Sequence, residues 1–411
     1  MTERVVITGL GALSGLGDGA KRQFEQAVAA TSGISELPAG VPAPLATRIA
    51  AQAPAFDAGL SREEASMFDR VAHMSWKAAT EALTHAGLAE LSEQDLEESG
   101  VFWGTGFGGA VTLERSYMEL LHEDKDRIRP FSIIGIMANG AAGLLALKSG
   151  FRGPSLTYST ACASSAHAIG EAFRQVRAGY CKRALAGGAE SLLTYGSIKA
   201  WEALRTLARL DEAHPERSCK PFSRNRSGFV LGEGAAAVVL ESLSSAQERG
   251  ANILAEVVGY GTSTDAIHVT KPDPAGQARA MRSALKDAHI APQEIAYINA
   301  HGTATAAGDA AETESIKLAF GEHAKLLLVS STKAVHGHTL GAAGALELVI
   351  TLQAQQHGIV PPTAFLEEAD PALDLDYVAL EARPVPVRYA MSNSFAFGGS
   401  NAALITKAWQ P

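Results

Sequence analysis

One cysteine stands in a sequence context suited to nucleophilic chemistry. Cys162 lies in the segment 158–166, where a strand-like run gives way to small residues and then to a helix-like stretch. A thiol in such a turn faces backbone N–H groups and the positive end of a helix dipole. We expect this setting to lower the pKa of the Cys162 thiol and to make it a nucleophile. A buried structural cysteine is the plainer alternative.

Two further segments offer imidazole and amine groups at predicted strand ends. His301 precedes a Gly/Thr turn in the segment 298–305, and Lys333, His336 and His338 share the small-residue segment 331–344. A single histidine at a strand end is more often a hydrogen-bonding residue than a catalyst. His336 and His338 also resemble a metal-ligand pair, but the sequence suggests no third ligand, so we expect no metal.

The fourth segment, 392–401, is an aromatic glycine turn that contains Phe397. In isolation it would be only a tight hairpin. Together the four segments place a Cys, two His and a Lys in loops at strand ends, where α/β sheets collect their active sites.

Composition excludes several classes of function. The 411 residues carry 35 Lys and Arg against 44 Asp and Glu, a net charge of −9, which argues against nucleic-acid binding. Three scattered cysteines form neither a disulfide framework nor a CxxC zinc motif. No apolar run is long enough to cross a bilayer, and the first residues lead straight into a strand-like run. We therefore expect a cytoplasmic protein without membrane segments.

Strand-like and helix-like stretches alternate in two cycles of similar size. This alternation predicts an α/β protein whose sheets are covered by helices. We expect single helices over residues 63–86 and 134–149 and a strand over residues 377–380. The cycles suggest duplicated α/β halves that join near residues 249–252. Residues 1–250 would hold Cys162, and residues 251–411 would hold both His301 and His338.

In this order and at these separations, the four segments resemble the β-ketoacyl-acyl-carrier-protein synthases, which are condensing enzymes of the thiolase fold. The resemblance covers essentially the whole chain, from residues 7–11 to residues 401–403. It implies a thiolase-like fold of two α/β halves in a five-layered αβαβα arrangement. The sequence looks closest to the elongating type II branch, which uses a Cys-His-His triad, and not to the initiating Cys-His-Asn branch.

The resemblance also implies residue roles. Cys162 matches the acylated nucleophile, and His301 and His338 match the other members of the triad. Lys333 matches the active-site lysine of the family, and Glu347 matches a buried glutamate that orders the Lys and His region.

Other matches concern the walls of the site. Phe397 matches the gating phenylalanine, whose backbone N–H would form an oxyanion hole with that of Cys162. Thr303 and Thr305 match positions that bind the phosphopantetheine arm, and Thr270 is a weaker candidate for the same role.

The implied reaction is a decarboxylative Claisen condensation. A Cys-bound acyl group would react with malonyl-acyl-carrier protein to give β-ketoacyl-acyl-carrier protein and CO2 in fatty-acid elongation. The resemblance implies no cofactor or metal, because the substrates arrive on the phosphopantetheine of acyl carrier protein.

Some positions depart from the family pattern. Ala396 replaces the usual Gly of the gating loop, which should reduce the freedom of that loop. Phe107 matches an acyl-pocket position that is often a smaller aliphatic residue, and it would narrow the pocket or simply pack at a dimer interface. The expected basic docking face for the carrier protein is reduced to weak candidates: Arg127, Arg129, Arg205 and Lys271.

Several alternatives stay open at this point. The same reaction could serve a type II polyketide or aryl-polyene pathway, with a chain-length-factor-like subunit in a heterodimer in place of a homodimer. A degradative thiolase would need a second catalytic cysteine near the C-terminus, whereas the last cysteine is Cys219. A non-enzymatic chain-length subunit would typically lack the nucleophile, which is present here as Cys162.

Overall fold

The strands of the protein fall into two groups of five. The computed structural model describes residues 3–37, 45–88, 90–123 and 125–410. The N-terminal group comprises β1 (Val5–Ser14), β5 (Ser99–Gly104), β6 (Ser155–Tyr158), β7 (Arg183–Glu190) and β8 (Gly234–Ser242). The C-terminal group comprises β9 (Ala255–Thr264), β10 (Ile295–Asn299), β11 (Leu328–Ser330), β14 (Tyr389–Phe395) and β15 (Ser400–Ala408).

The two groups repeat one topology. Their order in the sheet is β6-β5-β7-β8-β1 and β11-β10-β14-β15-β9, so each group, counted along the chain, has the order 3-2-4-5-1. In both groups the first two pairings of this order are parallel and the last two are antiparallel. This repeat confirms the predicted duplicated α/β architecture. The groups meet where residues 5–7 of β1 pair with residues 255–257 of β9.

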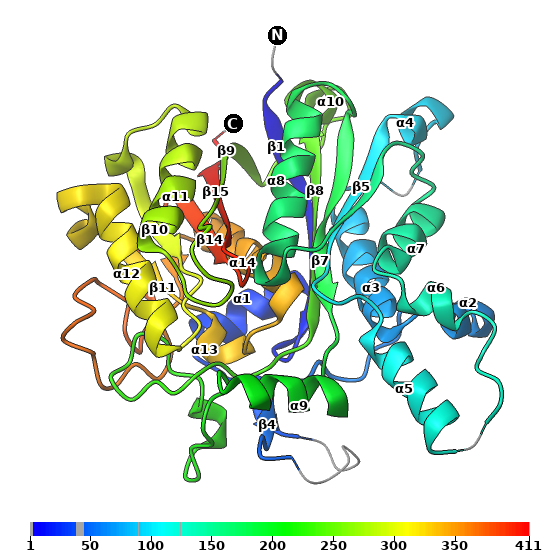
Figure 1. Ribbon diagram of the computed structural model, residues 1–411. Coiled ribbons are helices and arrows are strands. Elements are labelled where there is room, and N and C mark those ends of the chain that lie inside the picture. Colours follow the sequence, from blue (N-terminus) through cyan, green and yellow to red (C-terminus); the bar gives the residue numbers. More distant parts are fainter. Residues whose placement is uncertain (1–2, 38–44, 89, 124, 411) are drawn as a thin grey trace.

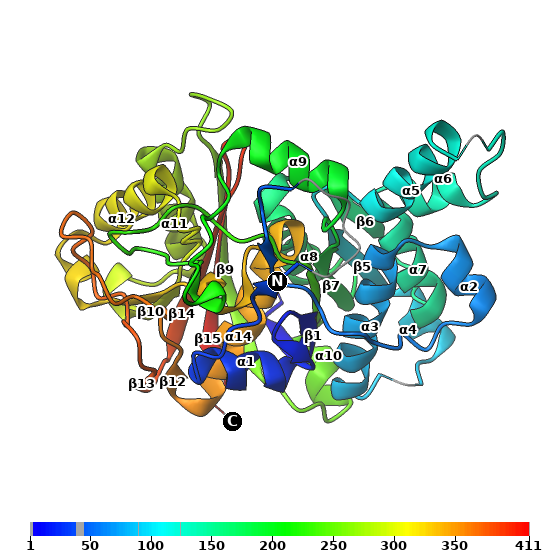
Figure 2. The same ribbon diagram turned by 90° about the horizontal axis from the view of Figure 1, so that it is seen from below.

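Helices separate and cover the two strand groups in five layers. In Figures 1 and 2, α3 (Arg70–His85) and α7 (Gly140–Ser149) cover the outer side of the N-terminal group. On the opposite outer side, α11 (Pro274–Ala288) and α12 (Ala306–Phe320) cover the C-terminal group. The middle layer contains α8 (Ser164–Arg177) and α14 (Ala343–His357). The predicted five-layered thiolase-like fold is therefore confirmed.

The sequence explains why α8 and α14 lie in the middle. All residues of α14 from Ala343 to Gln355 are buried, and ten of the fourteen residues of α8 are buried. A helix that buries residues on all sides requires packing partners on all sides. The two strand groups provide these partners, and the catalytic loops described below precede these two helices.

The remaining helices lie around the layers and in the connections. They are α1 (Ala20–Val28), α2 (Arg62–Met67), α4 (Glu93–Glu97), α5 (Ala110–Leu121), α6 (Ser132–Ile136), α9 (Tyr195–Leu204), α10 (Leu243–Glu248) and α13 (Lys333–His336). Short strands β2 (Gly17–Asp18), β3 (Ser35–Glu36), β4 (Ile49–Ala50), β12 (Ile359–Val360) and β13 (Arg383–Pro384) complete the described elements.

Three predicted elements are wrong in detail. The helix expected over residues 63–86 is two helices, because Phe68 is extended and the Asp69 carboxylate accepts the Val71 N–H as the N-cap of α3. The helix expected over residues 134–149 is likewise divided between α6 and α7. The strand expected over residues 377–380 is absent, because Val378 and Leu380 have φ values of 47° and 65°, outside the β region.

Within the part of the chain that the structure describes, no helix has the length and apolar character required to span a membrane.

Candidate active site

Cys162 lies in the turn between β6 and α8. It is the central residue of a short 3-10 helix, Ala161–Ala163, directly before the first residue of α8. Ala161 has φ 49°, in the left-handed region that L-residues rarely adopt. Cys162 is largely buried. The strand–turn–helix setting predicted from sequence is thus confirmed, and the strained turn gives the thiol one fixed direction.

The thiol faces an imidazole from the other half of the chain. The Nε2 atom of His338 lies 3.1 Å from Cys162 Sγ. On the opposite side of the ring, Nδ1 accepts the backbone N–H of Leu340 at 3.3 Å. A ring whose Nδ1 accepts carries its proton on Nε2. The His338 proton therefore points towards the thiol and the space in front of it.

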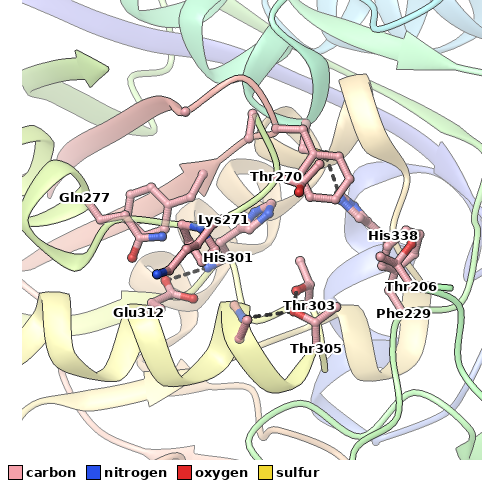
Figure 3. Close-up of a pocket in the computed structure, with 18 of the residues that line it drawn as sticks. Thr206, Phe229, Thr270, Lys271, Gln277, His301, Thr303, Thr305, Glu312 and His338 are labelled. Atoms are coloured by element: carbon pink, nitrogen blue, oxygen red, sulfur yellow. Dashed lines mark hydrogen bonds between the residues drawn. The ribbon is translucent and has the colours of Figure 1, made fainter. Parts of the chain in front are cut away.

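His301 lies across the pocket from His338. The centroids of the two rings are 5.4 Å apart, and the ring planes are nearly perpendicular. Figure 3 shows both rings turned towards the same space. The backbone of His301 is held by Glu312 of α12, whose carboxylate accepts the N–H groups of His301 at 2.8 Å and Gly302 at 2.7 Å. The turn after β10 is therefore anchored to the neighbouring helix.

Lys333 and Glu347 form a wholly buried ion pair behind the histidines. Burial raises the pKa of Glu347 to about 7, and the Lys333 charge opposes that rise. Burial first, and then the Lys333 charge, hold the pKa of His301 and His338 well below the usual histidine value. Both imidazoles are consequently neutral at neutral pH.

The expected low pKa of the nucleophile is wrong for the free protein. Burial raises the pKa of the Cys162 thiol to about 12, although the Lys333 charge lowers it. Removal of the thiol from water outweighs the favourable direction of the helix. Cys162 is therefore a thiol in the resting protein, and it would have to lose its proton to act as a nucleophile.

The three side chains also have the spacing of a metal-ligand group. One ligand atom each from Cys162, His301 and His338 lie within 4.8 Å of one another. His336 does not belong to this group. Its Nε2 atom lies 3.0 Å from Thr332 Oγ1 instead. The sequence pattern His-Gly-His thus does not correspond to a ligand pair in space. The absence of a metal stays a prediction.

Two backbone N–H groups would form the predicted oxyanion hole. Among the described residues the Phe397 N–H has no backbone acceptor, whereas the Cys162 N–H contacts its own sulfur. Phe397 lies in the turn between β14 and β15, and its ring stacks on Trp201 at 6.1 Å. The turn is closed by the Ala396 N–H, which donates to Ser400 O at 2.9 Å. This arrangement fits the predicted gating loop.

A pocket with about 1000 Å³ of empty space connects these groups to the surface. Its walls include Cys162, both histidines, Phe397 and the predicted arm-binding residues. Thr303 and Thr305 lie on one side of the pocket (Figure 3), with their hydroxyls 3.0 Å apart. Thr270 and Lys271 line the same pocket and are exposed. Residues from all four segments that the sequence indicated therefore line one pocket.

Other predicted residues lie away from this pocket. Phe107 is 59% exposed and is not among the residues that line it. Arg127 and Arg129 are exposed in the connection between α5 and α6, at a far corner of the molecule in Figures 1 and 2. Arg205 is exposed at the end of α9, next to the pocket residue Leu204. The four basic residues therefore do not form one patch on a single chain.

The sequence analysis missed several residues of the site. Glu312 holds the His301 turn, and Trp201 and Phe229 pack against Phe397 and His338. Glu312 is one of several polar residues in its helix, so the sequence does not single it out. Trp201 and Phe229 lie in α9 and in a loop that carried no chemical motif.

Comparison with known proteins now decides the family. A family model described as the N-terminal domain of β-ketoacyl synthase matches residues 2–246, and the model of the C-terminal domain matches residues 254–367. The chain belongs to the β-ketoacyl synthase family. It is therefore a condensing enzyme of the acyltransferase class, as the sequence resemblance implied.

Individual members of this family match over their full length. The chain is 40% identical to 3-oxoacyl-[acyl-carrier-protein] synthase 2 of Staphylococcus aureus (strain COL), with 99% of each chain covered. A type II PKS ketosynthase, solved in complex with its acyl-carrier protein and bound to a hexaketide, is 30% identical with a TM-score of 0.89. The ishigamide ketosynthase/chain length factor is 32% identical with a TM-score of 0.90. All of this chain and all of each solved chain are covered.

Proposed function

We propose that this β-ketoacyl synthase condenses a Cys162-bound acyl group with malonyl-acyl-carrier protein in fatty-acid elongation. The observation that carries the proposal is the buried group of one thiol and two neutral imidazoles around the same space. The 40% identity with a 3-oxoacyl-[acyl-carrier-protein] synthase over the whole chain supports this substrate class.

The first half-reaction transfers the acyl group. Cys162 Sγ attacks the carrier thioester, the new S–C bond forms, and the bond to the carrier sulfur breaks. The proton of Cys162 passes to the departing carrier thiol, so charge balances. The backbone N–H groups of Cys162 and Phe397 stabilise the negative oxygen of the tetrahedral intermediate.

The second half-reaction makes the carbon–carbon bond. The malonyl group loses CO2, and the electron pair of the broken C–C bond remains on the thioester as an enolate. His301 and His338 donate N–H groups to the enolate oxygen. Because both rings are neutral, they stabilise the enolate without protonating it. Its carbon attacks the acyl-Cys162 thioester, the C–S bond breaks, and the departing Cys162 thiolate takes up a proton from water.

Lys333 and Glu347 support this chemistry without contacting the thiol. The two charges lie behind the histidines, where the ammonium adds to burial in keeping both rings neutral. The proposed reaction uses no metal or organic cofactor, because the malonyl carboxylate provides the driving force. The pantetheine arm remains attached to acyl carrier protein, whereas the acyl chain passes to Cys162 and returns to a carrier as part of the β-ketoacyl product.

Docking of the carrier protein is proposed at the mouth of the pocket. Lys271 and Thr270 are exposed there, and Arg205 lies close by at the end of α9. Arg127 and Arg129 would contribute only if a second subunit brought them near this mouth. Arg129 already lies 3.9 Å from Glu119, so its charge is partly neutralised. A Lys271→Glu variant should therefore raise KM for the carrier substrate more than Arg129→Glu does.

We propose that the chain works as a dimer, in which residues 1–250 and 251–411 of each subunit form its two halves. Supporting this, β6 is an edge strand of the described sheet. Large apolar side chains are exposed on β6, the β5–α5 turn, α5, α6, α7 and the connections between them. They are Phe107, Tyr117, Met118, Leu121, Phe131, Ile133, Ile134, Met137, Leu147 and Leu156, called the apolar face below. An open sheet edge beside many exposed apolar side chains is typical of a subunit interface. Light scattering of the purified chain tests for the homodimer.

A type II polyketide pathway is the second candidate. It is favoured by the full-length similarity to a polyketide ketosynthase and to a ketosynthase/chain length factor. In that case the apolar face would bind a chain-length-factor-like subunit, and the purified chain alone would be monomeric or poorly soluble.

Reconstitution with acyl- and malonyl-acyl-carrier protein tests the proposed function. We expect one β-ketoacyl product and one CO2 per acyl group for the chain alone, and neither for Cys162→Ala. Several successive condensations that require a second subunit would favour the polyketide pathway. Transfer of the acyl group without CO2 release would contradict both.

A further inference from the structure

Glu190, at the end of β7, is a wholly buried carboxylate that binds two separate loops. Its Oε2 atom accepts the N–H groups of Gly106 at 2.7 Å and Gly341 at 3.1 Å. Its Oε1 atom accepts the N–H of Phe107 at 3.3 Å and the hydroxyl of Thr105 at 3.2 Å. Four donors from two loops therefore converge on one side chain. None of the reaction steps above uses it.

The two loops come from different halves of the fold. Residues 105–107 follow β5, whereas Gly341 belongs to the short 3-10 helix Leu340–Ala342 before α14. The backbones of Gly106 and Gly341 approach each other without a side chain between them. A Cβ atom on Gly341 would lie 2.6 Å from Glu190 Oε2, and one on Gly106 would lie 2.7 Å from the same oxygen. The carboxylate thus fixes the distance between the two backbones.

Gly341 is connected to the ring of His338 through the preceding residue, Leu340. Leu340, the residue before Gly341, has φ 48°, and its N–H donates to His338 Nδ1 at 3.3 Å. This donation is the contact that keeps the proton of His338 on Nε2, 3.1 Å from Cys162 Sγ. A shift of Gly341 would turn the Leu340 amide and release the ring.

We propose that Glu190 is a positioning residue for His338. By holding Gly341 against the turn 105–107, its carboxylate keeps the Leu340 amide, and through it the His338 ring, directed at Cys162. The inference rests on the roles proposed above for Cys162 and His338.

A second effect of Glu190 has the opposite sign and allows a clean test. The Glu190 charge is one of the causes that raise the pKa of the Cys162 thiol. Loss of the charge alone would make Cys162 react faster. Loss of the His338 position would make it react more slowly, because Nε2–H no longer stabilises the developing thiolate.

Burial raises the pKa of Glu190 to about 7, so the experiment is run well above that pH, where the side chain is charged. It measures the rate at which iodoacetamide alkylates Cys162, read by intact mass and peptide mapping. Glu190→Gln removes the charge, and Glu190→Asp keeps it but withdraws the oxygens by one carbon–carbon bond. Each is made in the native chain and in His338→Ala. In the native chain we expect each Glu190 variant to slow alkylation about tenfold. In His338→Ala we expect each to slow it less than about twofold, because the effects of residues that act through one group are not additive.

Glu81→Gln is the matched control. Glu81 is also a carboxylate that accepts two backbone N–H groups, from Ala12 at 2.9 Å and Ala20 at 2.8 Å, but it lies on α3 away from the pocket. Its replacement should change the melting temperature and leave the alkylation rate of Cys162 unaltered.

Several results would overturn the proposal. Equal slowing in both backgrounds would assign Glu190 a general structural role. Faster alkylation in Glu190→Gln with an unchanged rate in Glu190→Asp would show that only its charge matters. If Glu190→Gln does not fold, Glu190→Asp alone decides between the two. Alkylation at a residue other than Cys162 would instead contradict the proposed function.

Discussion

His338 Nε2 lies 3.1 Å from Cys162 Sγ, although 176 positions separate the two residues in the chain. Each residue belongs to a different half of the duplicated fold, and each lies in the loop that precedes a buried central helix. Because α8 and α14 pack side by side between the two strand groups, the loops before them open into one pocket. The site therefore exists only where the halves meet.

Removal of either charge of the buried Lys333–Glu347 pair should strongly reduce the stability of the protein. Glu347→Gln leaves the buried ammonium of Lys333 without its counter-charge, which typically costs about 3–5 kcal/mol. Urea denaturation should show this loss. The exposed Lys21–Glu25 pair provides the control, where Glu25→Gln should change stability by less than about 1 kcal/mol. Equal losses in the two variants would contradict a special cost at the buried site.

His336 should make the folded state sensitive to acid. Burial lowers its pKa from 6.5 to about 3, so below pH 6.5 the unfolded chain binds a proton that the folded chain does not. His336 therefore reduces stability by about 1.4 kcal/mol per pH unit as the pH falls from 6.5 towards 3. His301 and His338 add slopes of the same sign, so His336→Thr should reduce the acid slope by this contribution and not abolish it, as measured by denaturation at several pH values.

A control for His336 is available on the surface. The side chain of His214 is 54% exposed, and His214→Thr should leave the pH dependence of stability as it is in the native chain. An identical acid slope in the native chain and in His336→Thr would contradict a buried neutral His336.

Phe107 is expected to limit the acyl chain. It adjoins the Glu190 loop but is 59% exposed in the single chain, so it can act on the acyl group only if a partner subunit encloses it. We predict that Phe107→Ile moves the product distribution towards longer chains, as measured by mass spectrometry of the carrier-bound products. Phe131→Ile, on the same apolar face, is the control. An unchanged distribution would mean that Phe107 only packs at the interface.

Chelation should leave the reaction intact. The ligand atoms of Cys162, His301 and His338 lie close enough for a metal ion, but the proposed chemistry needs all three free. We expect full condensation activity after dialysis against a chelator and inhibition by added zinc. Loss of activity on chelation, with recovery on addition of zinc, would contradict a reaction without a metal.

The sequence predicted the fold well where a pattern extends over a whole element. Alternating strands and helices in two cycles correctly indicated the repeated halves, which the strand order confirms. The predictions were wrong where local backbone conformation decides. Phe68 interrupts a continuous helical pattern by adopting an extended conformation, and Val378 lies in a run of strand-forming residues but has a positive φ. Neither event changes the hydrophobic pattern.

Site residues were predictable where the chemistry marks them. The segments around Cys162, His301, Lys333 and His338 now surround one pocket or lie directly behind it. Glu190 and Glu312 were not predictable as members of the site. Their partners are backbone N–H groups, which no sequence pattern reveals. The raised pKa of Cys162 was also missed, because burial depends on the packing of both halves.

The central claim is that Cys162 carries the acyl group during the reaction. Intact-mass analysis after incubation with a panel of acyl-acyl-carrier proteins tests it most directly, with peptide mapping to locate the adduct. We predict a single acyl adduct on Cys162, absent in Cys162→Ala and released as β-ketoacyl product when malonyl-acyl-carrier protein is added. An adduct on Cys181 or Cys219 alone, or one that persists in Cys162→Ala, would contradict the account.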